Sequence, residues 1–145
     1  MQIRKVKKDY FVIGDLLNQL GIAHAKRRSF KKALRCFKDC LKVRKTVMGA
    51  QHEDVAETLH NMGNCAAKQN DLDKAAEYYE KSLIIKRLAL GNKSVSTANT
   101  LHRIGMVNEE LGLLSDSLNY YKDALAIRSS LLGKRHIDVA FSLHR

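Results

Sequence analysis

A heptapeptide that occurs twice constrains this chain more than any other feature. ETLHNMG at 57–63 returns 42 positions later as NTLHRIG at 99–105. The same shift aligns further columns, each of which keeps its residue type. These columns are Leu17, Leu59, Leu101 and Leu143; Gly21, Gly63 and Gly105; Ala33, Ala75 and Ser117; Phe37, Tyr79 and Tyr121; Leu41, Leu83 and Leu125; and Gly49, Gly91 and Gly133. A fixed period of this length is typical of a repeat protein built from copies of one supersecondary unit.

Apolar residues recur at helical spacing in two stretches of each unit. Leu59, Met62 and Ala66 lie on one stripe, and a second stripe begins at Ala75, after the polar sequence QND at 69–71. Proline is absent from the chain, so no proline interrupts a helix. Each unit is therefore predicted to be a pair of helices. We expect helices near residues 10–27, 30–48, 53–69, 71–90, 94–111, 113–132 and 136–145.

Three details of the unit carry structural predictions. Asp71 follows the polar turn and is a candidate N-cap, because its carboxylate can accept from free amides of the first turn. The closing glycines, such as Gly91, are candidates for a left-handed C-cap. The mid-helix glycines, such as Gly63, cost about 1 kcal/mol each relative to alanine. We therefore expect a partner helix to pack closely against the missing side chain. Because a hairpin cannot cover its own apolar face, each second helix should pack on the next unit's first helix.

The repeated positions resemble the tetratricopeptide repeat family over residues 13–145. The residues that carry this resemblance are Leu59, Met62, Gly63, Ala75, Tyr79, Ser82 and Leu83. The period and the segments GAQHEDVAETLHNMG and GKRHIDVAFSLHR look more specifically like the kinesin-light-chain subfamily. The chain departs from that subfamily's linker pattern at Glu53, Val95 and Ile137, which replace a proline, and at Ser94, which replaces a histidine.

The resemblance implies an all-α fold, a right-handed superhelical α-solenoid of antiparallel helix hairpins with three full repeats plus the first helix of a fourth. The predicted divisions are a basic N-terminal segment at 1–9 and a solenoid at 10–145, with repeats at about 10–51, 52–93 and 94–135 and a partial repeat at 136–145. Arg145 aligns with Arg103 in the middle of a first helix, and the sequence shows no polar capping element. We therefore expect a fragment of a longer array, or a last unit that packs on another surface.

The amino-acid composition limits the class of protein and its cellular compartment. The 145 residues are 45% hydrophobic and 28% charged, the balance of a soluble chain that can bury a core. No apolar run approaches the roughly 18 residues of a membrane span, and the first ten residues lack the apolar block of a signal peptide. Three cysteines are an odd number without the density of a disulfide scaffold. We therefore expect an intracellular, cytoplasmic protein without a transmembrane segment.

Catalytic and metal-binding patterns are missing from the sequence. GNKS at 91–94 lacks the first glycine of a phosphate-binding loop, and no Gly-x-Ser-x-Gly or His-Glu-x-x-His occurs. Equivalent histidines on stacked units should lie roughly 10 Å apart, whereas zinc ligands converge to about 2.0–2.1 Å from the metal. Cys36, Cys40 and Cys65 lack zinc-site spacing and are interpreted as small buried residues. We predict no enzymatic activity, no cofactor and no metal.

The family resemblance implies a concave groove lined by the first helix of each unit. One repeat column places three histidines in register with an asparagine, and two neighbouring columns add further polar residues and a methionine. The predicted groove residues are Asn18, Glu57, His60, Asn64, Asn99, His102, Met106 and His144. We expect them to form a ladder of donors and acceptors for an extended partner peptide. The alternative is a polar helix face that only meets water.

Positive charge is concentrated in the first third of the chain. The net charge is +11, and residues 1–48 hold 14 Lys or Arg and 3 Asp or Glu, while residues 49–145 hold 12 of each. The predicted basic patch consists of Lys26, Arg27, Arg28, Lys31, Lys32, Arg35, Lys38, Lys42 and Lys45. Five of these form one helical stripe without an interleaved acid, although like charges at i, i+4 repel. The patch therefore favours an acidic partner, and the alternative is a solvated convex face.

These observations predict a non-catalytic interaction scaffold or adaptor that binds an extended, acidic segment of a partner protein. Nucleic acid is disfavoured, because Phe30 and Phe37 are expected on the packing side and leave no exposed ring to stack on bases. Two alternatives stay open. One is binding of a polyanion, RNA or anionic lipid, through the basic first repeat. The other is a structural subunit packed in a large complex.

Overall fold

Six helices follow one another in the computed structural model, which describes the backbone of residues 2–143 and the side chains of residues 3–133. Within that range no strand occurs. The helices are α1 (Gln2–Lys26), α2 (Phe30–Met48), α3 (Glu53–Lys68), α4 (Leu72–Leu90), α5 (Val95–Glu110) and α6 (Leu114–Leu143). The boundaries of α2 to α5 agree with the expected helices to within two residues.

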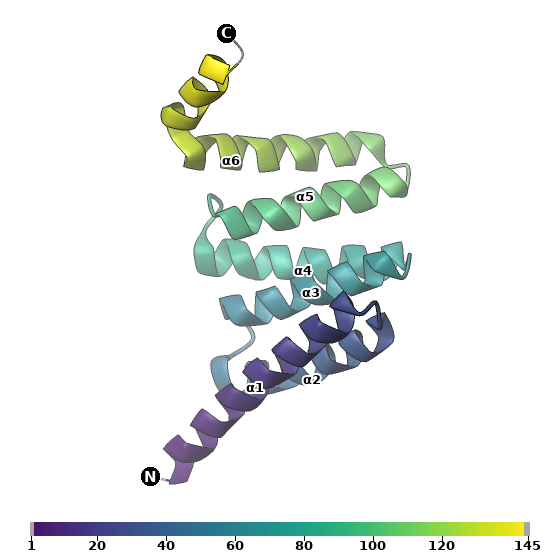
Figure 1. Cartoon of the computed structure of the whole chain (residues 1–145), viewed down its shortest axis with the longest axis vertical. Helices are drawn as coiled ribbons and strands as arrows, with labels where there is room; N and C mark the ends of the chain where they lie inside the picture. The colour runs from purple at the N-terminus through teal and green to yellow at the C-terminus, as the bar shows by residue number, and fades with distance from the viewer. Residues whose placement is uncertain (1, 144–145) are drawn as a thin grey trace.

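Consecutive helices pair as antiparallel hairpins, and the hairpins stack. Figure 1 shows the pairs α1/α2, α3/α4 and α5/α6 following one another along the long axis of the molecule. Each second helix packs on the next first helix, α2 on α3 and α4 on α5. The all-α solenoid of hairpins expected from the repeat is confirmed. The right-handed sense of its superhelix stays a prediction.

Two helices differ from the sequence expectation. Helix α1 begins at Gln2 and not near residue 10, so the basic segment continues directly into the solenoid. No proline or glycine precedes Gly14, and extending an existing helix costs far less than nucleating one. Helix α6 (Leu114–Leu143) joins the helix expected at 113–132 to residues 136–143 of the one expected at 136–145, with a non-helical residue between them, Gly133 (φ 66°, ψ −177°). Residues 144 and 145 lie outside the described residues.

The closing glycines adopt a more restricted conformation than a left-handed cap. Gly49 (φ 88°, ψ 158°) and Gly91 (φ 83°, ψ 174°) combine a positive φ with an extended ψ. This region is essentially accessible to glycine alone. The expected positive φ is confirmed, whereas the left-handed helical ψ is not. The prediction for Asp71 is confirmed, since its carboxylate accepts from the amide of Lys74 at 3.4 Å.

The mid-helix glycines lie under the aromatic ring of the same unit, as expected. A Cβ at Gly63 would lie 2.6 Å from Tyr79 Cδ1. The equivalent Cβ atoms at Gly21 and Gly105 would lie 2.6 Å from Phe37 and 2.8 Å from Tyr121. Real Cβ atoms do not come this close, so only glycine lets the two helices of a hairpin approach in this way.

Candidate partner-binding groove

A hollow of about 390 Å³ opens between α1 and α3 and reaches the start of α2. Its lining divides by chemistry into an apolar floor, a cationic rim and two amides. The lining residues are Ile22, Ala25, Phe30, Phe37 and Cys65, then Lys26, Arg28 and Lys68, then Asn61 and Asn64. No carboxylate lies among them. This hollow can take an apolar side chain next to an acidic one.

Internal contacts hold the polar groups of this hollow in place. The Arg28 guanidinium lies 5.6 Å from the centre of the Phe30 ring. Asn61 donates to the side-chain oxygen of Asn18 at 3.5 Å, from α3 to α1. The oxygen of Asn64 accepts from the Tyr79 hydroxyl, which leaves its NH₂ group to donate to a ligand. The hollow is therefore largely formed before a partner arrives.

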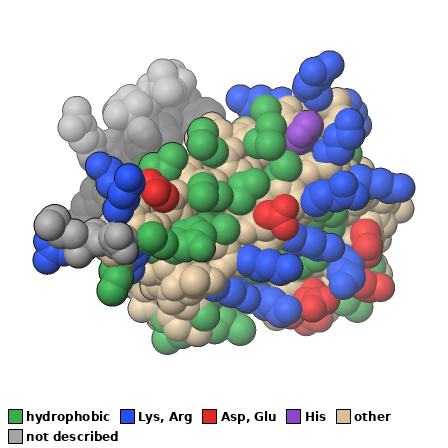
Figure 2. All heavy atoms as spheres, turned by 90° about the horizontal axis from the view of Figure 1, so that it is seen from below, with side chains coloured by type: hydrophobic (Ala, Val, Ile, Leu, Met, Phe, Trp, Pro, Cys, Tyr) green, Lys and Arg blue, Asp and Glu red, His purple; other side chains and the backbone are tan. Residues whose placement is uncertain are grey.

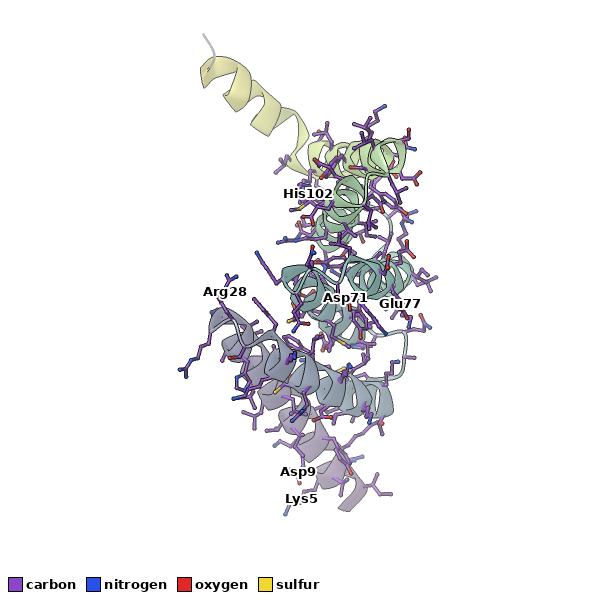
Figure 3. The ribbon with its side chains drawn as sticks, turned by 90° about the vertical axis from the view of Figure 1, so that its right-hand side faces the viewer. Lys5, Asp9, Arg28, Asp71, Glu77 and His102 are labelled. Carbon is purple, nitrogen blue, oxygen red and sulfur yellow. The ribbon has the colours of Figure 1, made fainter. Side chains whose placement is uncertain are left out.

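A second hollow of about 520 Å³ lies on the third unit and has the opposite charge. It is lined by His102, Met106, Glu109, Glu110 and Tyr121. The Tyr121 hydroxyl donates to Glu109 at 2.9 Å. Figure 3 shows Arg28 and His102 on the same side of the stack, with Glu77 on the opposite side.

One repeat column shows how the sign of the charge changes along this side. Lys26, Lys68 and Glu110 occupy equivalent positions in the three units. The first two line the cationic hollow and the third lines the acidic one. A partner segment that follows the stack therefore meets cations at the first two units and carboxylates at the third.

The predicted groove residues fall into different environments. Asn64, His102 and Met106 line the two hollows. Glu57 and Asn99 are exposed but pair within the chain, Glu57 with Lys86 at 3.6 Å and Asn99 with Arg128 at 2.9 Å. His144 lies outside the described residues.

His60 is placed inside the stack, contrary to the expected surface position. Its side chain is only 8% exposed, with Nδ1 3.0 Å from Thr100 Oγ1. The Tyr79 ring lies against it, with ring centres 5.3 Å apart. Burial, together with the positive charges of Lys86 and Arg103, lowers the pKa of His60 to about 3. His60 is therefore a neutral member of the junction between units, and His102 is the half-buried histidine that reaches a hollow.

Buried cations at the junctions between units are a feature that the sequence reasoning missed. Lys86 donates to Thr100 Oγ1 at 2.9 Å and to the Ser96 carbonyl at 3.3 Å. One unit earlier, Arg44 donates to Thr58 Oγ1 at 2.9 Å and to the Asp54 carbonyl at 3.3 Å. Burial lowers the pKa of Lys86, and nearby Glu57 opposes this shift. The sequence does contain a pattern that predicts these cations, because Arg44, Lys86 and Arg128 are all cationic and stand one repeat period apart.

The nine residues of the basic patch are all exposed. None of them forms an ion pair with a carboxylate of the described side chains. Lys26 and Arg28 reach the hollow between α1 and α3, while Lys31 and Lys32 border a shallower one beside it. The remaining patch residues that α2 carries lie along its exposed face. The patch thus adds positive charge next to the cationic hollow.

The cysteines are free, and two of them are buried as expected. Cys40 donates to the Gly14 carbonyl at 3.3 Å, where the helices of the first hairpin touch, and Cys36 is half-buried. Burial raises the pKa of Cys65 to about 11, so this thiol stays protonated.

No group of three or more metal-ligating side chains converges among the described residues. Over the same part of the chain, no helix combines the length and the hydropathy needed to cross a bilayer.

Comparisons with known proteins agree on the type of repeat. Two family models described as tetratricopeptide repeat match residues 12–88 and 97–138. No curated protein sequence matches the chain. Among solved structures, BtubC (BKLC) from P. vanneervenii is similar with a TM-score of 0.78 and 21% identity, over 83% of this chain and 48% of that one.

Two further solved structures are similar to this chain. A putative kinesin light chain from Podosopora anserina with nearly identical TPR-like repeats has a TM-score of 0.69 and 12% identity, over 79% of this chain and 54% of that one. The TPR domain of Arabidopsis FLU has a TM-score of 0.70 and 18% identity, over 83% of this chain and 95% of that one. At these identities the likeness concerns the fold. The chain spans about half the length of the first two structures.

Proposed function

The chain belongs to the tetratricopeptide repeat family, and on that premise we propose that it is a non-catalytic scaffold that holds an extended, acidic segment of a partner protein. The hollow between α1 and α3 carries this proposal, because three cations and no carboxylate surround an apolar floor there. The proposal includes that the chain has no cofactor and works in the cytoplasm, in keeping with its free cysteines.

The residues that line the two hollows predict the composition of the bound segment. Lys26, Arg28 and Lys68 favour carboxylates at the first two units, and opposite charge across an interface favours both correct orientation and fast association. The apolar floor favours one large apolar side chain beside those carboxylates. At the third unit Glu109 and Glu110 disfavour further acids. The segment should therefore be acidic at one end and neutral or basic at the other.

A second candidate function rests on the exposed basic patch, whose side chains have no acidic partner among the described residues. Such a surface can bind a polyanion such as RNA or an anionic lipid. Base stacking finds little support, because Phe37 is buried and Phe30 packs beside Arg28. Polyanion binding by the patch itself would rest on phosphate contacts, which weaken steeply as the salt concentration rises.

Binding of synthetic peptides tests the first function against the second. The probes are extended fluorescent peptides with one large apolar residue flanked by Asp and Glu, the same peptides with Lys and Arg, and an RNA homopolymer. We expect the intact chain to raise the anisotropy of the acidic peptides and to retain a sequence preference at high salt. Lys68→Glu should weaken this binding, whereas Lys93→Glu, the same charge change outside the lining of the hollow, should not. RNA binding with no peptide preference would overturn the scaffold proposal in favour of the second function.

A further inference from the structure

Helix α1 exposes a stripe of large apolar side chains on its outer face. The outer stripe consists of Ile3, Val6, Tyr10, Ile13, Leu16 and Leu20, which are 43–82% exposed. Their spacing of three and four residues puts them on one side of the helix. Figure 2, which views the molecule from below, shows hydrophobic side chains gathered across this end with Lys and Arg side chains beside them. An apolar surface of this kind usually marks an interaction site.

The repeat shows what kind of element fits this face. Ile13, Leu16 and Leu20 are equivalent to Val55, Thr58 and Met62 of α3, which are 0%, 0% and 2% exposed. In α3 these positions face the preceding helix α2. The equivalent positions of α5, Thr97, Thr100 and Ile104, are each 0% exposed next to α4. The outer stripe is therefore shaped to receive a helix.

Leu16 distinguishes α1 from α3 and α5, the first helices of the other two units. The equivalent residues Thr58 and Thr100 accept hydrogen bonds from the buried cations Arg44 and Lys86. A leucine cannot accept such a bond, so a cation buried against it would be left without a hydrogen-bond partner, which is unfavourable. The helix that covers α1 should therefore present apolar side chains at this contact.

The first turns of α1 add length and charge to the same face. Helix α1 has 25 residues, whereas α3 and α5 have 16 each. Ile3, Val6 and Tyr10 continue the outer stripe along the added turns. Four cations surround these turns against one acid, namely Arg4, Lys5, Lys7 and Lys8 against Asp9. Figure 3 shows Lys5 and Asp9 on the part of α1 that extends past the stack.

We propose that the outer stripe of α1 binds an amphipathic helix of a partner protein, apolar along its whole contact stripe and flanked by acidic side chains where it crosses residues 3–10. A second copy of this chain is disfavoured, because it would bring a net charge of +11 against +11. The site is separate from the groove and takes a folded helix in place of an extended segment.

Two helical peptides of opposite charge test this proposal. Both have about four heptads with leucine at positions a and d, and they carry either glutamate or lysine at e and g. Repulsion between like charges keeps each peptide from pairing with itself at neutral pH. We expect the glutamate peptide to bind the intact protein, measured by fluorescence anisotropy, and the lysine peptide to bind at least tenfold more weakly.

Variants locate the binding on α1. Leu16→Glu and Leu20→Glu should each weaken binding of the glutamate peptide at least tenfold with an unchanged circular dichroism spectrum, since both side chains are already exposed. Leu88→Glu, at a leucine of α4 that is 71% exposed, is the matched control and should leave binding unchanged.

Three results would overturn the proposal. They are equal affinity for the two peptides, no binding of either, and binding that Leu16→Glu and Leu20→Glu leave intact. Sedimentation equilibrium on the protein alone provides a fourth test. A dimer that is lost in Leu20→Glu would assign the stripe to a second copy of the chain instead.

Discussion

The ammonium group of Lys86 donates a hydrogen bond of 2.9 Å to the hydroxyl of Thr100, across the junction between the second and third units. Arg44 and Thr58 make the same bond, also of 2.9 Å, one unit earlier. Both cations are buried, Lys86 at 2% and Arg44 at 6% exposure. Each of these two junctions thus combines an apolar interface with one buried cation that needs a specific hydrogen-bond acceptor.

Replacing the acceptor should be costly. Thr100→Val removes the hydroxyl that Lys86 and His60 contact, and we expect a loss of about 1–3 kcal/mol in the free energy of unfolding, measured in urea. In the double variant Thr100→Val with Lys86→Met, the ammonium group that has lost its acceptor is also removed. The double variant should therefore be more stable than the sum of the two single effects predicts. Strictly additive effects would show that the bond across the junction contributes no coupling.

The mid-helix glycines should respond to substitution according to what faces them. Gly63→Ala places a Cβ 2.6 Å from the Tyr79 ring, and we expect overpacking to destabilise the fold by about 1–3 kcal/mol. Gly14→Ala is the matched control, because its Cβ would meet Arg44 Cγ at 3.5 Å, an ordinary contact. That variant should be neutral or gain up to about 1 kcal/mol in helix propensity. Thermal unfolding of both variants checks the contrast, and equal effects would contradict it.

Burial of neutral His60 should make stability depend on pH. Its pKa is about 3 in the folded chain against 6.5 ordinarily, so between these values the unfolded chain binds a proton that the folded chain does not. This contribution to stability is complete above pH 6.5 and is lost as the pH falls toward 3, by up to about 1.4 kcal/mol per pH unit.

A variant isolates this contribution from that of the carboxylates. His60→Gln stays neutral, so its stability should fall less than that of the parent between pH 7 and pH 5, as measured by urea unfolding at each pH. Parallel stability profiles for the two proteins would mean that His60 titrates in the folded chain as it does in the unfolded one.

The change of charge along the groove predicts opposite effects at equivalent positions. Lys68→Glu should weaken binding of an acidic peptide, whereas Glu110→Lys should strengthen it, each by several-fold at low salt. Raising the ionic strength should reduce both effects, because exposed charges are screened. Titrations of one labelled peptide at two salt concentrations measure this. Effects of the same sign for both variants would show that the peptide does not span the two hollows.

The sequence predicts the units, their helices and their closest contacts because these depend on short-range patterns. The column of mid-helix glycines predicts that a partner helix packs closely there, and the structure identifies the ring of Tyr79 as the group that meets Gly63. The turn at Asp71 follows from local chemistry in the same way. The long helix α1 was expected to begin later, because a family unit starts near residue 10 and nothing in that unit represents the added turns.

The environment of each polar side chain was harder to predict, because it depends on contacts between units. His60 and His102 share one column, yet Thr100 covers the first and the second lines a hollow. The equivalent of Thr100 one unit on is Ser142, whose side chain lies outside the described residues. The column of Arg44 and Lys86 was visible as positive charge, but its burial depends on how closely two units pack.

The buried cations have a consequence for how such an array changes in length. The donor at Lys86 and the acceptor at Thr100 lie 14 positions apart, less than one period. A tandem duplication of one full period that begins after Leu16 therefore reproduces a donor and an acceptor at the correct separation. Genes for such chains can gain or lose units by unequal recombination without inventing a new interface. The leucine at position 16 lacks this acceptor, so the same process cannot extend the array across α1 without a second change.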